Sequence, residues 1–233
     1  MLDKKSFTFF ALAACLALTP LPACAAPKAA KAADKPAENA QTSADQFIQK
    51  LGDRAVSILA DKATDQTTKE ALFRDMMHET FDLKTIGRFV LGRNAWMGAT
   101  IPQQEEYSSL FEKLVIQIYT DRFAFYSGEI FKVISSRPEG DRDFIVTSHV
   151  VRPASTQPIV VDWRVRSTEG HMGIIDVIVE GISMSVTQRQ EYSAIVQRND
   201  GKIDELLKLM HERLDNTAAQ NKKDRSESWT TAQ

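Results

Sequence analysis

The feature that most constrains this chain is a change in the period of its apolar residues. From Asp45 to about Tyr126 they recur every three to four residues, which is the spacing of amphipathic helices. Between Ile130 and Glu180 they alternate with polar residues, which is the period of strands, and from Met184 the helical period returns. Helices gathered before and after a run of strands predict an α+β fold rather than alternating parallel units.

The predicted sheet has four strands joined by short turns that contain proline or glycine. Strands joined in this way pair with their neighbours in the chain, so we expect an antiparallel meander. The architecture we predict is a strongly curved antiparallel four-stranded sheet wrapped by N- and C-terminal helices, which together enclose an apolar cavity. The strands are expected at residues 130–135, 144–151, 159–165 and 174–180.

The third strand alternates most clearly and defines an inward face. Its apolar residues are Ile159, Val161, Trp163 and Val165, and its polar residues are Asp162, Arg164 and Arg166. On the fourth strand we expect Ile175, Val177 and Val179 to share that inward face, which requires a loop of odd length between the two strands. Arg164 and Asp176 would then lie on the opposite face and pair across the strands.

The helical segments carry recognisable start and stop signals. Thr67 with Glu70 and Thr100 with Gln103 fit capping boxes, Asp82 can cap a short third helix, and Gly92 can end it. In the helix that runs from Thr100 to about Tyr126, apolar residues occupy more of the circumference than a surface helix needs. We therefore expect apolar partners on more than one of its sides. The last two helices are expected at residues 184–198 and 203–214.

The first 25 residues predict an export signal. Lys4 and Lys5 precede an apolar run from Phe7 to Leu18, and Ala23-Cys24-Ala25 has the small residues of a cleavage site. The apolar run is too short to span a bilayer as a stable helix. A second interpretation takes Leu21-Pro22-Ala23-Cys24 as a lipobox with lipidation of Cys24, although proline before the small residue makes this less attractive.

Four segments follow from these signals. Residues 1–25 are the signal peptide, 26–44 a flexible leader rich in Ala, Lys and Pro, 45–215 the folded domain and 216–233 a disordered tail. Both cysteines, Cys15 and Cys24, lie in the first segment, so the remainder has no disulfide and no cysteine-based zinc site. The formal net charge of −2 gives no general attraction to nucleic acid.

Catalytic motifs are not evident in the sequence. The four histidines lack the spacing of zinc proteases, and no G-x-S-x-G, Walker A or G-x-G-x-x-G stretch occurs. Two candidates stay open: His149, which Asp143 or Asp162 would orient as a general base, and the carboxylate pair of Asp176 and Glu180. For both, packing or solvation is the more common role. The aromatic residues of the long helix and the sheet fit either a packed core or the lining of an apolar cavity.

Several motifs resemble the MlaC-type periplasmic phospholipid-binding proteins, also called the toluene-tolerance family. The most specific is Asp176-Val177-Ile178-Val179-Glu180-Gly181-Ile182-Ser183-Met184, followed by Arg189, Tyr192 and Gly201 before Leu206. Further matches are Val90-Leu91-Gly92-Arg93, the helix start from Ala99-Thr100 to Gln104, and Tyr126-Ser127-Gly128-Glu129. The resemblance covers about residues 45–215 and leaves the leader outside.

The resemblance implies a soluble, non-enzymatic, cofactor-free carrier that moves phospholipid across the periplasm of a Gram-negative bacterium and supports outer-membrane lipid asymmetry. Members hold acyl chains between a curved sheet and helices, with the head group outside. The implied partners are an inner-membrane ABC transporter with an MCE-domain ring and an outer-membrane lipoprotein–porin complex. A similar subgroup is associated with hopanoids, and the sequence does not separate the two cargoes.

Joining the resemblance to the period of the strands gives a site hypothesis. We expect a floor of inward strand residues, a movable helical wall, and two further lipid-binding residues after the last strand. Acyl-chain burial would be driven by about 0.8 kcal/mol per methylene. A cone-shaped enzyme using His149 or Asp176, and a docking adaptor without a cavity, are the rival interpretations. The floor is Val161, Trp163, Val165, Val177 and Val179, the wall is Leu114, Ile118, Phe123 and Tyr126, and the two further residues are Ile182 and Met184.

Overall fold

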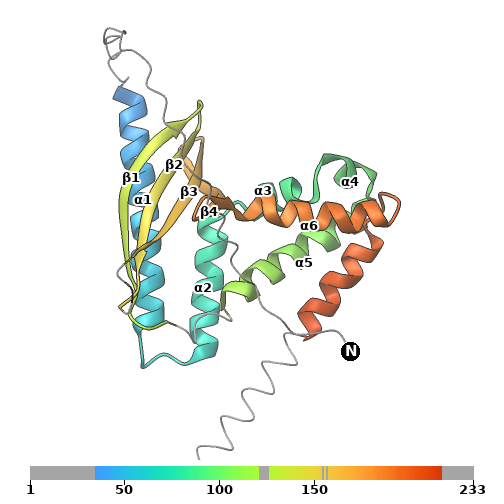
Figure 1. Cartoon of the computed structure of the whole chain (residues 1–233), viewed down its shortest axis with the longest axis horizontal. Coiled ribbons are helices and arrows are strands. Elements are labelled where there is room, and N and C mark those ends of the chain that lie inside the picture. The colour runs from blue at the N-terminus through green and yellow to red at the C-terminus, as the bar shows by residue number, and fades with distance from the viewer. Residues whose placement is uncertain (1–34, 121–125, 154, 156, 217–233) are drawn as a thin grey trace, which may run out of the picture. The chain divides into compact units, whose positions relative to one another are not determined.

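The computed structural model describes residues 35–120, 126–153, 155 and 157–216. Helices precede and follow one sheet, as the change of period predicts (Figure 1). No helix in these ranges is long and apolar enough to cross a membrane. The elements are α1 (Lys35–Ala60), α2 (Gln66–Thr80), α3 (Leu83–Leu91), α4 (Arg93–Gly98), α5 (Ile101–Thr120), β1 (Ile130–Glu139), β2 (Asp143–Val151), β3 (Ile159–Thr168), β4 (His171–Val179), β5 (Ile182–Ser183) and α6 (Met184–Arg198), and residues 204–216 are also helical.

The sheet is an antiparallel meander with strand order β1-β2-β3-β4-β5. The α+β class and the four predicted strands are confirmed, and β1, β3 and β4 are longer than expected. The fifth strand is a difference from the prediction, since only two residues, Ile182 and Ser183, pair with the end of β4. Such a short segment has no detectable alternation of its own, which is why the period of the sequence does not reveal it.

Helix α1 begins at Lys35, ten residues before the expected start at Asp45. Residues 35–44 are therefore helical, in contrast to the expected leader, and Ala44 is fully buried. The side chain of Gln41 donates to the Ser136 carbonyl over 2.8 Å, which ties this early part of the helix to β1. Residues 26–34 of the expected leader, the signal segment and residues 217–233 of the expected tail lie outside the described residues.

Helix caps agree with the sequence at two of three positions. The Asp82 carboxylate accepts from the Thr85 amide at the start of α3, and Thr100 and Gln103 form the expected capping box before α5. The expected box of Thr67 is wrong, because the N-cap of α2 is Asp65, which accepts from the Thr68 amide over 3.0 Å. The short helix α4 was not anticipated by the sequence pattern.

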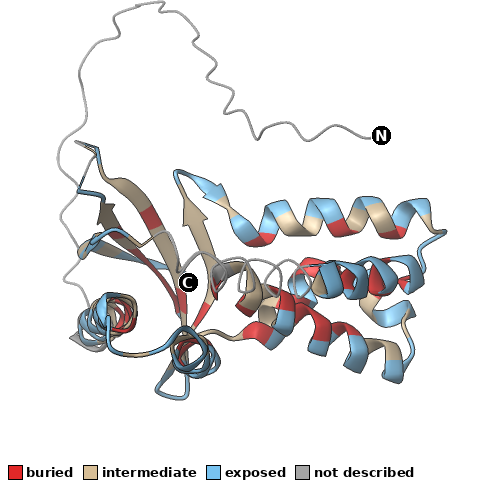
Figure 2. Ribbon diagram, turned by 90° about the horizontal axis from the view of Figure 1, so that it is seen from below, coloured by how far each residue is buried: buried red, intermediate tan, exposed pale blue. Residues whose placement is uncertain are grey.

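Buried apolar residues form two cores, and α5 contributes to both. Figure 2 shows buried positions on the helices and on the sheet. One core joins α3, α4, α5, α6 and the helix of residues 204–216, with Tyr107 at its centre donating to the Gly87 carbonyl over 2.9 Å. Burial raises the pKa of the Tyr107 hydroxyl well above its ordinary value, and burial raises the pKa of Tyr192 to about 12. The other core lies between α1, α2 and the sheet and receives Ile116 from α5. The width of the apolar surface on this helix is thereby explained.

A bulge changes the register between β3 and β4. Trp163 pairs with Val177, so here the two strands share the inward face that the sequence predicts. The turn, however, consists of two residues, Glu169 and Gly170, both with positive φ, rather than an odd number. An irregularity after Arg164 absorbs the difference. As a result Ile174, and not Ile175, pairs with Val165 and is fully buried.

The outer face of the sheet is held by Asp143, which is 5 % exposed. Its carboxylate accepts from Arg166 at 2.7 and 2.9 Å and from Arg164 at 3.0 Å. The hydrogen bond from Arg166, together with that from Arg164, holds the pKa of Asp143 below its ordinary value. Arg164 and Asp176 are register partners as predicted, but the ion pair of Arg164 is made with Asp143. The predicted Arg164–Asp176 pair is therefore wrong.

Replacement of Asp143 by Asn is expected to lower the free energy of unfolding at pH 7 by about 2 kcal/mol, because a hydrogen-bonded buried charge is removed from two arginines. A lowered folded-state pKa stabilises the protein above pH 4, and this contribution disappears as the pH falls through the folded-state value. The difference between Asp143→Asn and the parent should therefore shrink between pH 5 and pH 2, as followed by urea unfolding.

The matched control is Asp141→Asn, which changes an exposed carboxylate in the same turn. It should leave the urea midpoint within experimental error. Equal destabilisation at pH 7 by the two variants, or a pH-independent loss for Asp143→Asn, would contradict the role given to this carboxylate.

Candidate functional site

One face of the sheet packs toward α1 and α2, and we call it the inner face. The burial of its side chains is uneven. Val146, Val165 and Ile174 are fully buried and Val161 is 7 % exposed, whereas Trp163, Val177 and Val179 are only partly buried. The inner face comprises Phe131, Val133, Phe144, Val146, Ser148, Val150, Ile159, Val161, Trp163, Val165, Ile174, Val177 and Val179. This apolar surface is thus mostly covered, and Trp163, Val177 and Val179 are positions where the cover is incomplete.

All five predicted floor residues lie on the inner face. Val161 and Val165 are buried, at 7 % and 0 % exposure, and Trp163, Val177 and Val179 are partly buried. The register places Val161 opposite Val179 and Trp163 opposite Val177. Alternation along the strands was therefore sufficient to bring these five side chains together.

Trp163 is held in a defined orientation. Its indole N–H donates to the Ser148 hydroxyl over 2.8 Å, and its ring meets Phe131 edge to face with centroids 6.1 Å apart. Phe131 in turn lies directly against Gly52 of α1, where an added Cβ would be 2.0 Å from the phenyl ring. The glycine lets the helix approach β1 closely, so the helix, the phenyl ring and the indole form one continuous contact.

The predicted helical wall is only partly where it was expected. Ile118 of α5 and Tyr126 are partly buried, and Phe123 lies outside the described residues. Leu114 is 4 % exposed and packs in the helical core with Tyr107 and Tyr192 rather than against the sheet. Ile116, which the sequence hypothesis did not include, is the α5 residue that reaches the sheet core. Because α5 has apolar residues on several sides, its sequence alone did not show which side faces the strands.

The two remaining predicted residues follow β4 and are exposed. Ile182 is 54 % exposed and Met184 is 36 % exposed. They come after a two-residue turn in which Glu180 has φ 50° and Gly181 has φ 79°. That geometry reverses β4 into β5 and favours glycine at the second position. The two side chains therefore stand at the edge of the sheet rather than within the inner face.

Asp176 is the centre of the corner that joins β4 to α6. It accepts from the Ser183 hydroxyl at 2.6 Å, from the Ser185 hydroxyl at 2.6 Å and from the Ser185 amide at 3.1 Å. Ser183 also caps α6 by accepting from the Val186 amide. The Glu180 carboxylate accepts from the Val160 amide at 2.6 Å and so extends the pairing of β3 with β4. These acidic and hydroxyl side chains of the specific motif have a structural role.

The geometry gives little support to the catalytic candidates. Asp143, which would orient His149, is bound by two arginines, and Asp162 accepts from the Thr147 hydroxyl at 2.6 Å. The lone pairs of Asp176 are used by the serines that follow it. Within the described ranges no three His, Cys, Asp or Glu side chains are grouped in a way that would hold a metal ion.

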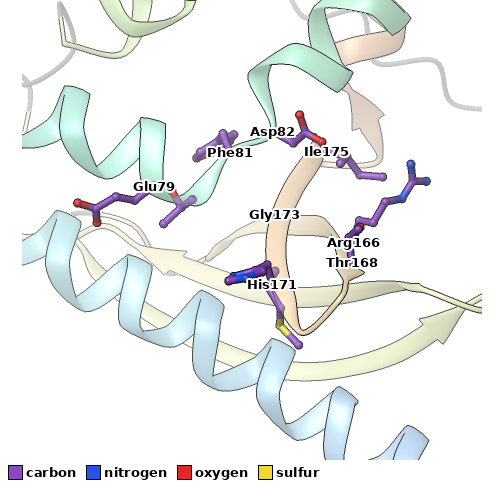
Figure 3. Close-up of a pocket in the computed structure, with 10 residues that line it drawn as sticks. Glu79, Phe81, Asp82, Arg166, Thr168, His171, Gly173 and Ile175 are labelled. Carbon is purple, nitrogen blue, oxygen red and sulfur yellow. The ribbon is translucent and has the colours of Figure 1, made fainter.

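A pocket of about 210 Å³ lies where the end of α2 meets the β3–β4 hairpin (Figure 3). Glu79 and Asp82 approach it from the helical side, and Arg166, Thr168 and His171 from the strands. Its lining is too polar for acyl chains, and none of the predicted lipid-binding residues contributes to it. None of the predicted lipid-binding residues lines two further surface pockets, one beside the helix of residues 204–216 and one between α4 and α6.

Comparison with known proteins decides the family. Residues 49–212, well over half of the chain, match the family model described as MlaC protein. The chain belongs to the MlaC family. Among individual relatives, the intermembrane phospholipid transport system binding protein MlaC of Haemophilus influenzae is 23% identical over 180 residues, which cover 74% of this chain and 83% of the relative.

A solved structure supports the fold independently. The phospholipid-binding protein of Ralstonia solanacearum, determined in complex with a phospholipid, superimposes with a TM-score of 0.66 at 21% identity, covering 75% of this chain and 98% of the other. The MlaC resemblance inferred from the motifs is thereby confirmed, together with the α+β fold. The most specific motif lies at the β4–α6 corner, and the further match at residues 90–93 lies at the α3–α4 junction.

Replacement of Asp176 by Asn is expected to lower the free energy of unfolding by roughly 2 kcal/mol, since a carboxylate that accepts several hydrogen bonds is lost from a partly buried corner. Bound lipid should be retained, because the side chain is on the outer side of β4. Urea unfolding and lipid extraction check the two parts. Glu191→Gln, on the exposed side of α6, is the control and should change neither. Loss of lipid from a folded Asp176→Asn protein would contradict the structural role.

Proposed function

We propose that this protein is a non-enzymatic phospholipid carrier that holds acyl chains against the incompletely covered part of its inner face. The observation that carries the proposal is the partial exposure of Trp163, Val177 and Val179 on a face whose other apolar residues, such as Val146, Val161 and Val165, are buried. An apolar surface that is aligned but incompletely covered is suited to a flexible apolar ligand. Ile118 and Tyr126 are the partly buried residues that would close over the chains from the helical side.

The energetics favour acyl chains over smaller apolar ligands. Each methylene removed from water contributes about 0.8 kcal/mol, so ten buried methylenes contribute about 8 kcal/mol before ordering costs. The polar side chains of the sheet lie on the outer face or are already bonded, as Ser148 is to the Trp163 indole. The inner face therefore offers hydrophobic burial and no charged group that would need neutralising by the ligand.

The relatives support the identity of the cargo. The Haemophilus protein is named as a binding protein of an intermembrane phospholipid transport system, and the Ralstonia protein was solved with a phospholipid. By this analogy we propose phospholipid as the cargo, with a hopanoid-related lipid as the alternative. The expected export signal agrees with a periplasmic location. In the proposed shuttle the protein exchanges lipid with two partners, an inner-membrane ABC transporter bearing an MCE-domain ring and an outer-membrane lipoprotein–porin complex. This exchange would support lipid asymmetry and toluene tolerance.

Placing a carboxylate on the inner face should abolish lipid binding. Val177→Glu is expected to remove at least nine-tenths of the lipid that co-purifies from a Gram-negative periplasm, because a charge would face the acyl chains. The matched control is Ile178→Glu, which places the same group on the neighbouring, equally half-buried position of the opposite face. Native mass spectrometry followed by lipid extraction gives the amount bound and distinguishes phospholipid from hopanoid.

Folding must be checked for both variants, because either carboxylate can destabilise the sheet. Circular dichroism and the urea midpoint provide this check. The proposal predicts loss of lipid from folded Val177→Glu and retention by folded Ile178→Glu. Retention by both folded variants, or a parent protein that carries no lipid and acquires none from liposomes, would contradict the proposed site.

A further inference from the structure

One of the surface pockets described above lies between the start of α4 and α6. Its volume is about 580 Å³, which is within the range of small-ligand sites. Leu91, Ala95 and Val196 form its apolar part, and the remaining lining is polar or glycine: Gly92, Arg93, Asn94, Arg189, Ser193, Gln197 and Gly201. Two arginines thus line it and no acidic residue does.

The absence of acidic lining separates this pocket from the other two. The pocket of Figure 3 combines Arg166 with Glu79 and Asp82, and the pocket beside residues 204–216 combines one lysine with four carboxylates. In both, cationic and anionic side chains are available to each other. Only in the pocket between α4 and α6, among these three, is the charge of a single sign.

Arg189 is oriented before any ligand binds. Its guanidinium lies 4.8 Å from the centre of the Phe89 ring, and Nη1 donates to the Phe89 carbonyl over 3.2 Å. The same group passes over Gly92, with Nη2 3.6 Å from the position of an added Cβ. The contact with the Phe89 ring and carbonyl uses only one of the N–H donors of the Arg189 guanidinium, so its other N–H groups are available to an anion.

Neither arginine of the pocket is neutralised by an acidic side chain among the described residues. In the described part of the chain, no Asp or Glu oxygen lies within ion-pair distance of Arg93 or Arg189. Arg93 is exposed at the start of α4. Two unpaired guanidinium groups beside the Asn94, Ser193 and Gln197 side chains make a set of donors that suits a tetrahedral oxyanion, because arginine forks match phosphate oxygens.

Arg189 is the α6 residue of the pocket that comes first after the proposed lipid site in the chain. Arg189 is five residues after Met184 on α6, which corresponds to about 7.5 Å along the helix axis. Met184 follows β5, whose Ile182 pairs with Val179 of the inner face. If a phospholipid leaves that face past β5, the first turns of α6, which carry Arg189, are the part of the pocket that its phosphate meets first.

We infer that the pocket between α4 and α6 is a phosphate-binding site, formed by Arg93 and Arg189, that takes the phosphate of a phospholipid head group or a free phosphate. That the phosphate comes from a lipid rests on the proposed function, whereas the anion site itself does not. The site would engage the head group during transfer and leave the acyl chains to the inner face.

The test is a titration of the protein, purified from a Gram-negative periplasm and freed of lipid, followed by amide NMR shifts. One arm uses inorganic phosphate, and the other uses dihexanoyl phosphatidylglycerol below its micelle concentration. Shifts are expected at Asn94 and Ser193. Arg93→Gln and Arg189→Gln should each weaken binding roughly tenfold, as expected for loss of a charge-assisted hydrogen bond.

Arg88→Gln is the matched control. Arg88 is a neighbouring exposed arginine that stacks on Trp96 at 4.9 Å and does not line the pocket, so its loss tests the general effect of charge. It should weaken binding less than twofold. Arg189→Gln also loses the bond to the Phe89 carbonyl, and if it fails to fold, Arg93→Gln carries the test because its side chain has no such bond.

The arms separate the two sources of phosphate. Binding of the short lipid alone supports a head-group site, and binding of both supports a general phosphate site. Absence of shifts in both arms, or an equal effect of Arg88→Gln, would overturn the inference. Lipid co-purifying with the untreated protein is measured on the same preparation, so failure of the carrier function is distinguished from failure of this pocket.

Discussion

The close contact of α1 with the first strand is the constraint on which the rest of the structure depends. Gly52 leaves no Cβ, so the Phe131 ring lies against the helix backbone, and the Trp163 indole packs on that ring. Gln49 accepts from the Val133 amide at the irregularity of β1, which satisfies a donor that the ladder leaves unpaired. The helix thereby lies closest to β1, and Phe131 carries its contact across the sheet to Trp163 of β3.

Packing is divided between two cores. The helical core around Tyr107 and the sheet core around Val146 and Ile174 are each closely packed, and α5 links them through Leu114 on one side and Ile116 on the other. The β4–α6 corner is held by Asp176 and the two serines that follow it. The inner face is therefore flanked by two cores, each with its own set of buried side chains.

Features that follow from the spacing of apolar residues could be predicted from the sequence. Features that follow from tertiary packing could not. Alternation on β3 identified Val161, Trp163 and Val165, and the caps Asp82 and Thr100 marked two helix starts. The bulge that exchanges Ile175 for Ile174, and the side of α5 that meets the sheet, are set by tertiary contacts and leave no local signal. The extension of α1 back to Lys35 was hidden because Ala, Lys, Glu and Gln form helices as readily as they form leaders.

The most direct test of the account is to ask which residues touch the acyl chains. A phospholipid carrying a diazirine at the end of one chain, loaded into the protein and photolysed, labels whatever lies beside it. The account predicts adducts on β3 and β4 peptides, at Trp163, Val177 and Val179, and on α5 near Ile118. Labelling confined to exposed residues such as Met97 and Ile101, or no labelling of a protein shown to be loaded, would contradict the central claim.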